Sequence, residues 1–383
     1  MDSAVDPEWS ILLAACSPAP PRDKTARILS QLQQPVRWPK LLALADEHGT
    51  QPLLFQALSP LEKAIPPDAM QSLRQSCQSN LHKTLLLSRE LIRIVQHLSG
   101  LGIEVMTYKG PASAEVLYAD LALRQSGDID LLIHAPDFAR VRDAVRDLGY
   151  TPHDRFSAAE EQAYLKSGYE CAFDGPAGRN LLELQWAVQP RFYAVDFDLN
   201  GLFQRSVTVP VAGQPMRTPA PSDLFIILSL HVAKHVWGRL KWLCDLARLM
   251  NLPSLDWKWI GSQARDLGIA RILQVTMLLA NQLLDASVPA AAQENLPKDR
   301  VTAALVKQVR DHIVNQAAFN VESLAYFRLM MRLRERPADR LRFLTRLAFT
   351  PGPGERAAIH LPQPLFPLYP LVRLSRLAAR VLR

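Results

Sequence analysis

One short stretch constrains the fold of this chain more than any other: two aspartates open an apolar run at residues 128–133. Successive side chains of a β-strand point to opposite faces, so Asp128 and Asp130 share one face. Ile129 and Leu131 then point the other way, into a core. The stretch therefore predicts a strand with one acidic face and one buried face.

The acidic face of this strand requires a neutralising cation, because like charges on one face repel each other. A divalent cation such as Mg²⁺ (or Mn²⁺) meets this need, since it binds carboxylate and phosphate oxygens together. Gly127, directly before the pair, lets a backbone or a nucleotide phosphate come close. The pattern favours a metal-dependent phosphoryl or nucleotidyl transfer site. The alternative is a surface strand with two solvated aspartates.

Length and composition describe a globular chain of 383 residues, 48% hydrophobic and 21% charged, which suggests two or three domains. No run of 18 apolar residues occurs, so we expect no membrane-spanning helix. The acidic residues 1–8 are unlike a signal peptide. The four cysteines, at positions 16, 77, 171 and 244, show neither CxxC nor zinc spacing. We therefore expect reduced thiols and a cytoplasmic protein.

Positive charge is concentrated at one end of the chain. Residues 331–383 contain eleven Arg and no Lys against three acidic residues, a net charge of +8, while the whole chain carries +7. This basic tail predicts contact with an acidic partner, with nucleic acid or with an anionic membrane surface. The alternative is an arginine-rich helical surface without a partner.

Changes in pattern divide the chain into four parts. Residues 1–100 form an N-terminal helical region, residues 101–218 an α/β core, residues 219–350 a C-terminal helical domain, and residues 351–383 a Pro/Gly linker with a basic helical tail. The expected fold class is α+β, with a small mixed sheet flanked by helical regions. Strands are expected at 103–108, 128–133, 169–173, 181–186 and 207–211. Helices are expected at 111–118, 136–148, 240–250, 257–285, 300–316 and 320–347.

A third carboxylate occurs in the alternating stretch 181–186, where Glu183 and Gln185 share a face. The chain between Asp128 and Glu183 is long enough for a helix and a hairpin that bring the two strands together. Nucleotidyl transfer needs carboxylates for metal, donors for the triphosphate and an acceptor in line with the α-phosphorus. Glu183 is therefore the candidate third metal ligand. The alternative is an exposed strand residue.

Candidate phosphate ligands gather around a predicted helix start at Lys109-Gly110-Pro111. A helix N-terminus attracts anions, and Gly110 frees the backbone to approach a phosphate. We expect Lys109 to contact a β- or γ-phosphate and Ser113 to offer a hydroxyl one turn later. Arg124 is expected either to bind phosphate or to pair with the carboxylates. Its alternative is a loop salt bridge of little consequence.

A histidine pair lies on a helix predicted after residue 222. His231 and His235 are four residues apart, a zinc spacing, but the sequence lacks the glutamate of HExxH and an evident third ligand. The favoured interpretation is a helix that is half core and half wall of a substrate cleft. The candidate cleft residues are Lys234, His235, Arg239 and Asp245. For each of them a purely structural role is the alternative.

These pieces together resemble a known family. They are Tyr108-Lys109-Gly110-Pro111-Ala112, Arg124-x-x-Gly127-Asp128-Ile129-Asp130, Leu182-Glu183-Leu184-x-Trp186 and His231-x-x-Lys234-His235-x-Trp237, the last extended by Leu240-Lys241-Trp242-Leu-x-Asp245. The combination resembles the uncharacterised nucleotidyltransferase family of bacteria, within the DNA polymerase β-like nucleotidyltransferase superfamily. The resemblance covers most of residues 80–375.

The resemblance implies a small mixed sheet with helices behind it that carries Asp128, Asp130 and Glu183 as metal ligands. Lys109-Gly110 resembles a replacement for the Gly-Ser phosphate turn of the superfamily, and Gln185 stands where relatives often have His. The implied activity is Mg²⁺-dependent transfer of NMP from an NTP, with ATP favoured, to a hydroxyl of a small molecule or protein. Pyrophosphate is the implied second product.

Two other functions stay open. The first is a non-enzymatic nucleotide- or protein-binding module that keeps the fold, and the complete set of three carboxylates argues against it. The second is a transferase that acts on nucleic acid through the basic tail. The sequence shows neither a zinc knuckle nor an evident aromatic stacking platform for that role.

Overall fold

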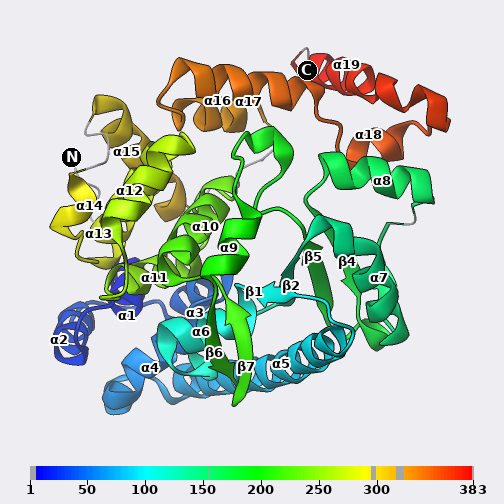
Figure 1. Ribbon diagram of the computed structural model, residues 1–383. Coiled ribbons are helices and arrows are strands. Elements are labelled where there is room, and N and C mark those ends of the chain that lie inside the picture. The colour runs from blue at the N-terminus through cyan, green and yellow to red at the C-terminus, as the bar shows by residue number, and fades with distance from the viewer. Residues whose placement is uncertain (1–5, 155, 295–298, 316–322, 382–383) are drawn as a thin grey trace.

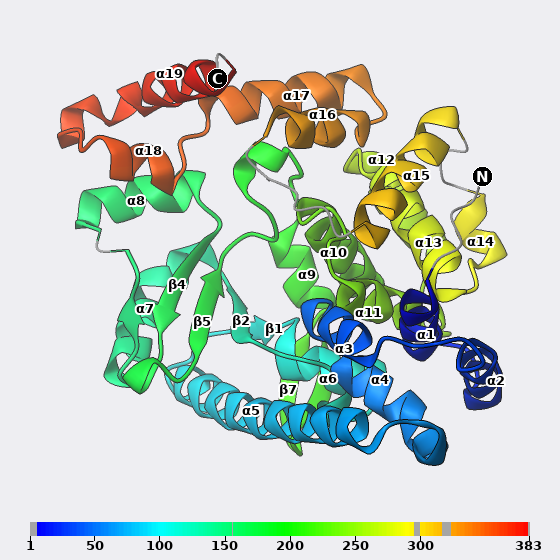
Figure 2. The same cartoon turned by 180° about the vertical axis from the view of Figure 1, so that it is seen from behind.

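The computed structural model describes residues 6–154, 156–294, 299–315 and 323–381. Within these residues a small mixed β-sheet lies among helices, so the expected α+β class is confirmed (Figures 1 and 2). In the same part of the chain, no helix combines the length and apolarity needed to cross a membrane.

The main sheet has five strands in the order β1-β2-β5-β4-β3. Their bounds are β1 Val105–Thr107, β2 Asp128–Ile133, β3 Thr151–Pro152, β4 Glu170–Asp174 and β5 Leu181–Gln185. β2 and β5 run parallel, and the other neighbouring strands are antiparallel. The expected strands are confirmed, with β1 shorter than predicted. β3 has only two residues, which is too short for an alternating pattern to reveal it.

One face of this sheet packs against two helices, α5 (Pro67–Gly100) and α7 (Phe138–Asp147). In Figure 2, α5 runs along one side of the sheet region and α7 lies next to β4. Ile129 and Leu131 point into this core, as their alternation with the aspartates predicts. Burying such side chains contributes about 1.5–3 kcal/mol each. This apolar face leaves the acidic face turned toward the other side of the sheet.

The helices before and after the sheet share one hydrophobic core. The N-terminal members are α1 Pro7–Cys16, α2 Pro21–Gln31, α3 Trp38–Glu47 and α4 Gln51–Leu58. The C-terminal members are α10 Pro221–Lys234, α11 Leu240–Met250, α12 Trp257–Asp266, α13 Ala270–Leu284, α14 Ala290–Gln293 and α15 Arg300–Val314. The domain limits at 100, 218 and 350 stay predictions, and this common core shows that the two helical regions bury their apolar faces together.

Two long helices expected from the sequence are each divided in the structure. The segment 257–285 becomes α12 and α13, separated at Gly268, whose φ of 68° is a left-handed helix stop. The segment 320–347 becomes α16 (Leu324–Arg332) and α17 (Pro337–Phe349). Residues 320–322 of the expected helix lie outside the described residues. Pro337 lacks an amide hydrogen and is therefore tolerated only in a first helical turn.

Smaller elements complete the α/β region: α6 Gly110–Tyr118, α8 Ala158–Ser167 and α9 Leu199–Arg205. A separate hairpin pairs β6 (Val207–Val211) with β7 (Gln214–Thr218). Its two turn residues, Ala212 and Gly213, have φ values of 47° and 79°, the positive angles that a tight two-residue hairpin turn requires. The sequence predicts β6, whereas β7 is too polar for its pattern to stand out.

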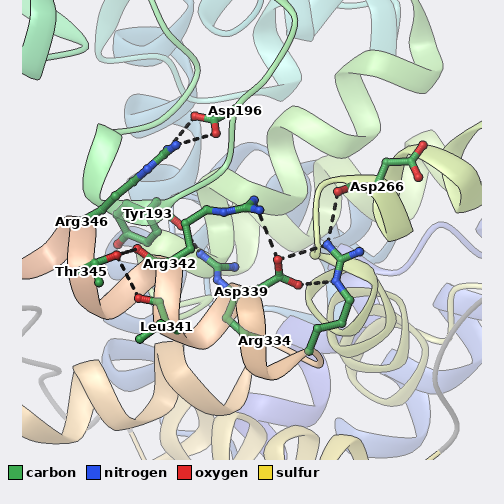
Figure 3. Close-up of polar contacts among 10 residues, drawn as sticks. Tyr193, Asp196, Asp266, Arg334, Asp339, Leu341, Arg342, Thr345 and Arg346 are labelled. Atoms are coloured by element: carbon green, nitrogen blue, oxygen red, sulfur yellow. Dashed lines mark hydrogen bonds and ion pairs between the residues drawn. The ribbon is translucent and has the colours of Figure 1, made fainter.

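The C-terminal helices are tied to the body of the protein by arginines, as Figure 3 shows. Arg334, whose side chain is 2% exposed, donates to the carbonyl oxygen of Tyr193 over 2.6 Å. Arg346 forms a two-pronged ion pair with Asp196, with both N···O distances 2.6 Å. α17 is thereby joined to the segment after β5. α18 (Pro353–Ala358) and α19 (Tyr369–Val381) follow, with α18 next to α8 in both views (Figures 1 and 2).

Candidate active site

The structure brings the three predicted carboxylates together on one face of the sheet. The parallel pairing of β2 with β5 places Asp130 directly opposite Glu183, and Asp128 lies two residues back along β2 on the same face. Asp130 is buried, with 1% of its surface exposed, while Asp128 and Glu183 are half-buried. A local alternation in each strand and one long-range register therefore create a single acidic patch.

Lys109 supplies a cation to this patch. It caps the N-terminus of α6, and its Nζ lies 2.8 Å from Oδ1 of Asp130. Burial opposes the charge on the ammonium, but the Asp130 carboxylate outweighs it and raises the pKa of Lys109 above its usual range. Among the described residues, Oδ2 of Asp130 has no hydrogen-bond partner. One carboxylate oxygen of the patch is therefore neutralised and the other is left open.

Gln185 joins the acidic side chains through one amide group. Its Nε2 donates to Asp130 Oδ1 over 3.2 Å, to Glu183 Oε2 over 3.0 Å and to Glu170 Oε2 over 3.3 Å. The hydroxyl of Tyr108 donates to Oε1 of the same amide, which sets its orientation. Glu170 was not predicted from the sequence, because only the antiparallel register of β4 with β5 places it opposite Gln185.

The acidic patch holds more negative charge than its one lysine balances. Burial, and then the charges of Asp130 and Glu170, raise the pKa of Glu183 to about 8. Burial and Asp130 likewise raise the pKa of Asp128. Nearby carboxylates perturbed in this way are typical of functional sites.

The oxygen donors of the patch suit a hard divalent cation, and the open Oδ2 of Asp130 is a buried acceptor aimed at none of the described donors. In the described part of the chain, however, no three His, Cys, Asp or Glu side chains converge closely enough to form a finished metal cluster. Lys109 holds Asp130 in this conformation, so a metal ion would share or replace that contact.

Two of the predicted phosphate ligands are already engaged elsewhere. Arg124, 6% exposed, pairs with Asp245 at 3.0 Å between Nε and Oδ2, and Tyr118 donates its hydroxyl to the same carboxylate over 2.9 Å. The hydroxyl of the buried Ser113 donates to the carbonyl oxygen of Tyr108 over 3.0 Å. These contacts favour structural roles for Arg124 and Ser113. Of the two options expected for Arg124, the structure has it paired with a carboxylate, but with one outside the acidic patch.

The two glycines of the phosphate motif differ in their surroundings. Gly110 has a φ of 57°, which favours glycine, and a Cβ there would lie 3.2 Å from the carbonyl oxygen of Asp128. Gly110 was predicted to let a phosphate approach the backbone closely. In the structure the group that lies close to Gly110 is the backbone of β2. Gly127 has open space where a side chain would stand. It leaves a route to Asp128 from outside.

A cavity of about 780 Å³ opens beside Gly127. We call it the serine-rich groove, because Ser72, Ser76, Ser79 and Ser126 line it. Its floor is a polar stripe of α5, and its walls include Lys83, Arg239 and Lys241. No carboxylate of the described chain lies within 4.0 Å of the charged groups of these three residues. Burial and Arg124 lower the pKa of Lys241 to about 8. The groove is therefore a polar, cationic approach to the Asp128 end of the patch.

A second cavity of about 330 Å³ lies toward the C-terminal helices, and we call it the aromatic pocket. Its walls carry five aromatic side chains together with cationic groups, and the aromatic members are Tyr169, Phe192, Tyr193, Tyr326 and Phe327. Lys234 and His235 also line it. The four predicted cleft residues are thus divided among three places, since Arg239 lines the groove and Asp245 is buried.

His231, in the last turn of α10, and His235, which caps the C-terminus of that helix, pack as neutral rings. Their centroids are 4.8 Å apart, and each lies 5.2 Å from the ring of Trp242. Burial and Lys234 lower the pKa of His235 to about 3, and burial and Lys109 lower that of His231. The described residues provide no third ligand for a metal here. The packing favours the interpretation of this helix as core and cleft wall.

Comparisons with known proteins show the family of this chain. Residues 34–285, well over half of the chain, match the sequence model of a family described as "Uncharacterised nucleotidyltransferase". No curated protein matches the chain. A similar solved structure is that of an antigenic nucleotidyltransferase-like protein from Paracoccidioides brasiliensis, at 17% identity and a TM-score of 0.32, covering 56% of this chain and 96% of that one. The chain is a transferase, and it belongs to the uncharacterised nucleotidyltransferase family.

Proposed function

We propose that this protein is a metal-dependent enzyme that moves NMP, with ATP as the favoured donor, to a hydroxyl of an acceptor and releases pyrophosphate. The observation that carries the proposal is the pairing of Asp130 with Glu183 across β2 and β5, with Asp128 on the same face. These three carboxylates would hold Mg²⁺ (or Mn²⁺), which would supply the positive charge that stabilises the transferring phosphoryl group. The open Oδ2 of Asp130 supports this donor set.

The donor nucleotide is assigned to the Asp128 end of the patch. Lys109 and Gly110 lie at the N-terminus of α6, where backbone amides and the helix dipole favour phosphate. Arg239 and Lys241 line the adjoining groove, and no carboxylate of the described chain pairs with them. Because Arg124 is held by Asp245, we assign the phosphate contacts to Lys109, Lys241 and Arg239 in its place.

The acceptor is assigned to the Glu183 end. In the transfer step the acceptor oxygen forms a bond to the α-phosphorus while the bond to the pyrophosphate oxygen breaks. We assign to Glu183 the role of taking the proton that the acceptor hydroxyl loses. Gln185 Nε2, 3.0 Å from Glu183 Oε2, would orient this carboxylate. Most of the rate acceleration would thus come from positioning the two substrates and from stabilising the negative charge of the transferring phosphoryl group, as in phosphoryl transfer generally.

The test measures pyrophosphate release with Mg²⁺ and each NTP in turn, with cell extract as the source of acceptor. We expect release by the wild-type protein and its loss in Asp128→Asn and Asp130→Asn. Asp68→Asn is the matched control, because it removes the same charge from the exposed first turn of α5. Equal release by wild type and both site variants, all folded, would overturn the proposal.

The same assay separates the two alternatives. ATP binding without turnover across many extracts would favour a binding module that keeps the fold. Label from the NTP that appears in RNA or DNA would make nucleic acid the acceptor.

A further inference from the structure

We infer that the aromatic pocket is the acceptor subsite, and that it takes a small planar hydroxyl compound carrying an anionic group. The inference rests on the proposed function, because it assigns the second substrate of the same site. The pocket volume of about 330 Å³ corresponds to roughly ten water-sized groups. It therefore fits a small molecule in which a single ring carries a hydroxyl and a charged group.

A chain of polar contacts joins this pocket to the carboxylate that takes the acceptor proton. Lys234 Nζ lies 3.1 Å from the Tyr169 hydroxyl, which itself donates to Glu170. Glu170 and Glu183 then share the Gln185 amide, at 3.3 and 3.0 Å. The pocket thus lies beside the Glu183 end of the acidic patch, whereas the serine-rich groove lies at the opposite end. Two substrates that enter from the two cavities would meet at the carboxylates.

The net positive charge of the residues that line the pocket favours an anionic ligand. In the described chain no carboxylate lies within 4.0 Å of the Lys234 ammonium, which contacts the hydroxyl and the ring of Tyr169. Arg373 and Arg376 share one carboxylate, that of Glu355, at 3.1 and 3.4 Å. The walls therefore carry three cations against one anion. Lys234 is half-buried, and the carboxylates of Glu170, Glu183 and Asp130 attract its ammonium only from beyond 4.0 Å. A carboxylate or phosphate on the ligand would give this ammonium a direct, charge-assisted contact.

The shape of the pocket favours a planar ligand. Three of its five aromatic side chains, Tyr169, Phe192 and Phe327, are only half-buried, and they offer ring surface for stacking. The hydroxyl of Tyr326 donates to the carbonyl oxygen of Lys234 over 3.0 Å, which fixes the helix α16 against α10. Arg334, between α16 and α17, contacts Tyr193, and Arg346 of α17 contacts Asp196, so that these arginines secure the other wall (Figure 3). These contacts hold the walls of the pocket in place in the absence of a ligand.

The test uses two probes that differ in charge, 4-hydroxybenzoate and the neutral 4-hydroxybenzamide, titrated by calorimetry into the full chain without NTP. A ligand of this size is expected to bind with a Kd on the order of 10 mM or tighter. We expect the amide to bind about tenfold more weakly than the benzoate. Lys234→Met should weaken the benzoate about tenfold and leave the amide unchanged. Lys241→Met is the matched control, since it removes a lysine from the groove and should leave benzoate binding unchanged.

A second variant keeps the test decisive if Lys234→Met fails to fold. Gly352 lines the pocket with a φ of −107°, and a Cβ there would meet Glu355 Oε2 at 3.5 Å and Arg373 Nη1 at 4.0 Å, both ordinary contact distances. Gly352→Leu should therefore fold and abolish the binding of both probes by filling space. Equal binding of the two probes, no binding of either, or an effect of Lys241→Met equal to that of Lys234→Met would overturn the inference.

The outcome is separable from that of the proposed function. Pyrophosphate release that depends on Asp128, together with no probe binding at Lys234, would overturn the acceptor subsite alone. Probe binding at Lys234 without any metal-dependent release would overturn both the enzyme and the acceptor assignment, and would leave an anion-binding pocket.

Discussion

At the scale of single residues, Gln185 organises the acidic patch without itself being a candidate metal ligand. Its one amide contacts three carboxylates, and the Tyr108 hydroxyl holds its oxygen. Side chains that orient metal ligands typically account for 10–100-fold in metal affinity or activity. We expect Gln185→Leu to raise the Mg²⁺ concentration for half-maximal pyrophosphate release by roughly that factor. An unchanged Mg²⁺ dependence in a folded Gln185→Leu protein would contradict the role.

The buried pair of Arg124 and Asp245 makes a second prediction at this scale. Removing one partner leaves the other charge buried and unpaired, which costs roughly 3–5 kcal/mol. We therefore expect Arg124→Met and Asp245→Leu each to lower the free energy of unfolding by about that amount, measured by urea denaturation. The double variant should lose much less than the two losses combined. Additive losses would mean that the pair is not coupled.

At the scale of elements, His48 joins the end of α3 to the start of α11. Its ring is 2% exposed, and its Nδ1 accepts the backbone N–H of Leu240 over 3.3 Å. Burial and the charge of Arg239 lower the pKa of His48 from 6.5 to about 4. The ring is therefore neutral in the folded protein at pH values where the unfolded chain already binds a proton.

This difference predicts a pH dependence of stability. Because the folded pKa lies below the unfolded one, stability is complete above pH 6.5 and falls as the pH drops toward 4. Between about pH 7.5 and 5, His48 should account for a loss of roughly 2 kcal/mol in the free energy of unfolding, measured by urea denaturation. His231 and His235, whose pKa values are also lowered, add to the total loss. His48→Asn keeps an acceptor near the position of Nδ1 and cannot titrate, so its stability should fall less over the same range. Equal losses for both proteins would exclude His48 as the cause.

The sequence reveals elements where the pattern is local and long enough. β2 and β6 have their predicted bounds, since apolar alternation or β-branched residues fill each strand. The two-residue β3 and the polar β7 escape prediction, because their stability comes from pairing with neighbouring strands. Gly268 and Pro337, the residues at which the two expected helices break, stand in the sequence. The helical spacing of apolar residues continues on both sides of each, so the breaks were not predicted.

At the scale of the whole molecule, the arginine-rich tail is part of the folded body. Each tail arginine whose side chain is described has an internal partner; these are Arg332, Arg334, Arg336, Arg340, Arg342, Arg346, Arg373 and Arg376. Five of these arginines pair with carboxylates, whereas Arg332, Arg334 and Arg340 donate to neutral oxygens. Guanidinium groups held by internal carboxylates release fewer counterions from a nucleic acid. The contacts thus favour the alternative of an arginine-rich helical surface.

This arrangement predicts weak and only mildly salt-dependent binding of nucleic acid. We expect the logarithm of the binding constant for a single-stranded RNA to fall with the logarithm of salt concentration with a slope shallower than about −2. Fluorescence polarisation between about 50 and 200 mM salt measures this slope. A slope of about −6 or steeper would restore nucleic acid as the partner of the tail.

The sequence by itself determined that Asp128 and Asp130 share a face, and that Glu183 lies on a strand of the same kind. These are local facts, because side-chain direction along a strand follows from backbone geometry alone. Only the tertiary structure decided that Asp130 faces Glu183, that Glu170 joins them and that Arg124 pairs with Asp245. Each of these contacts joins residues far apart in the chain, and their register is set by how the whole sheet and the shared helical core pack.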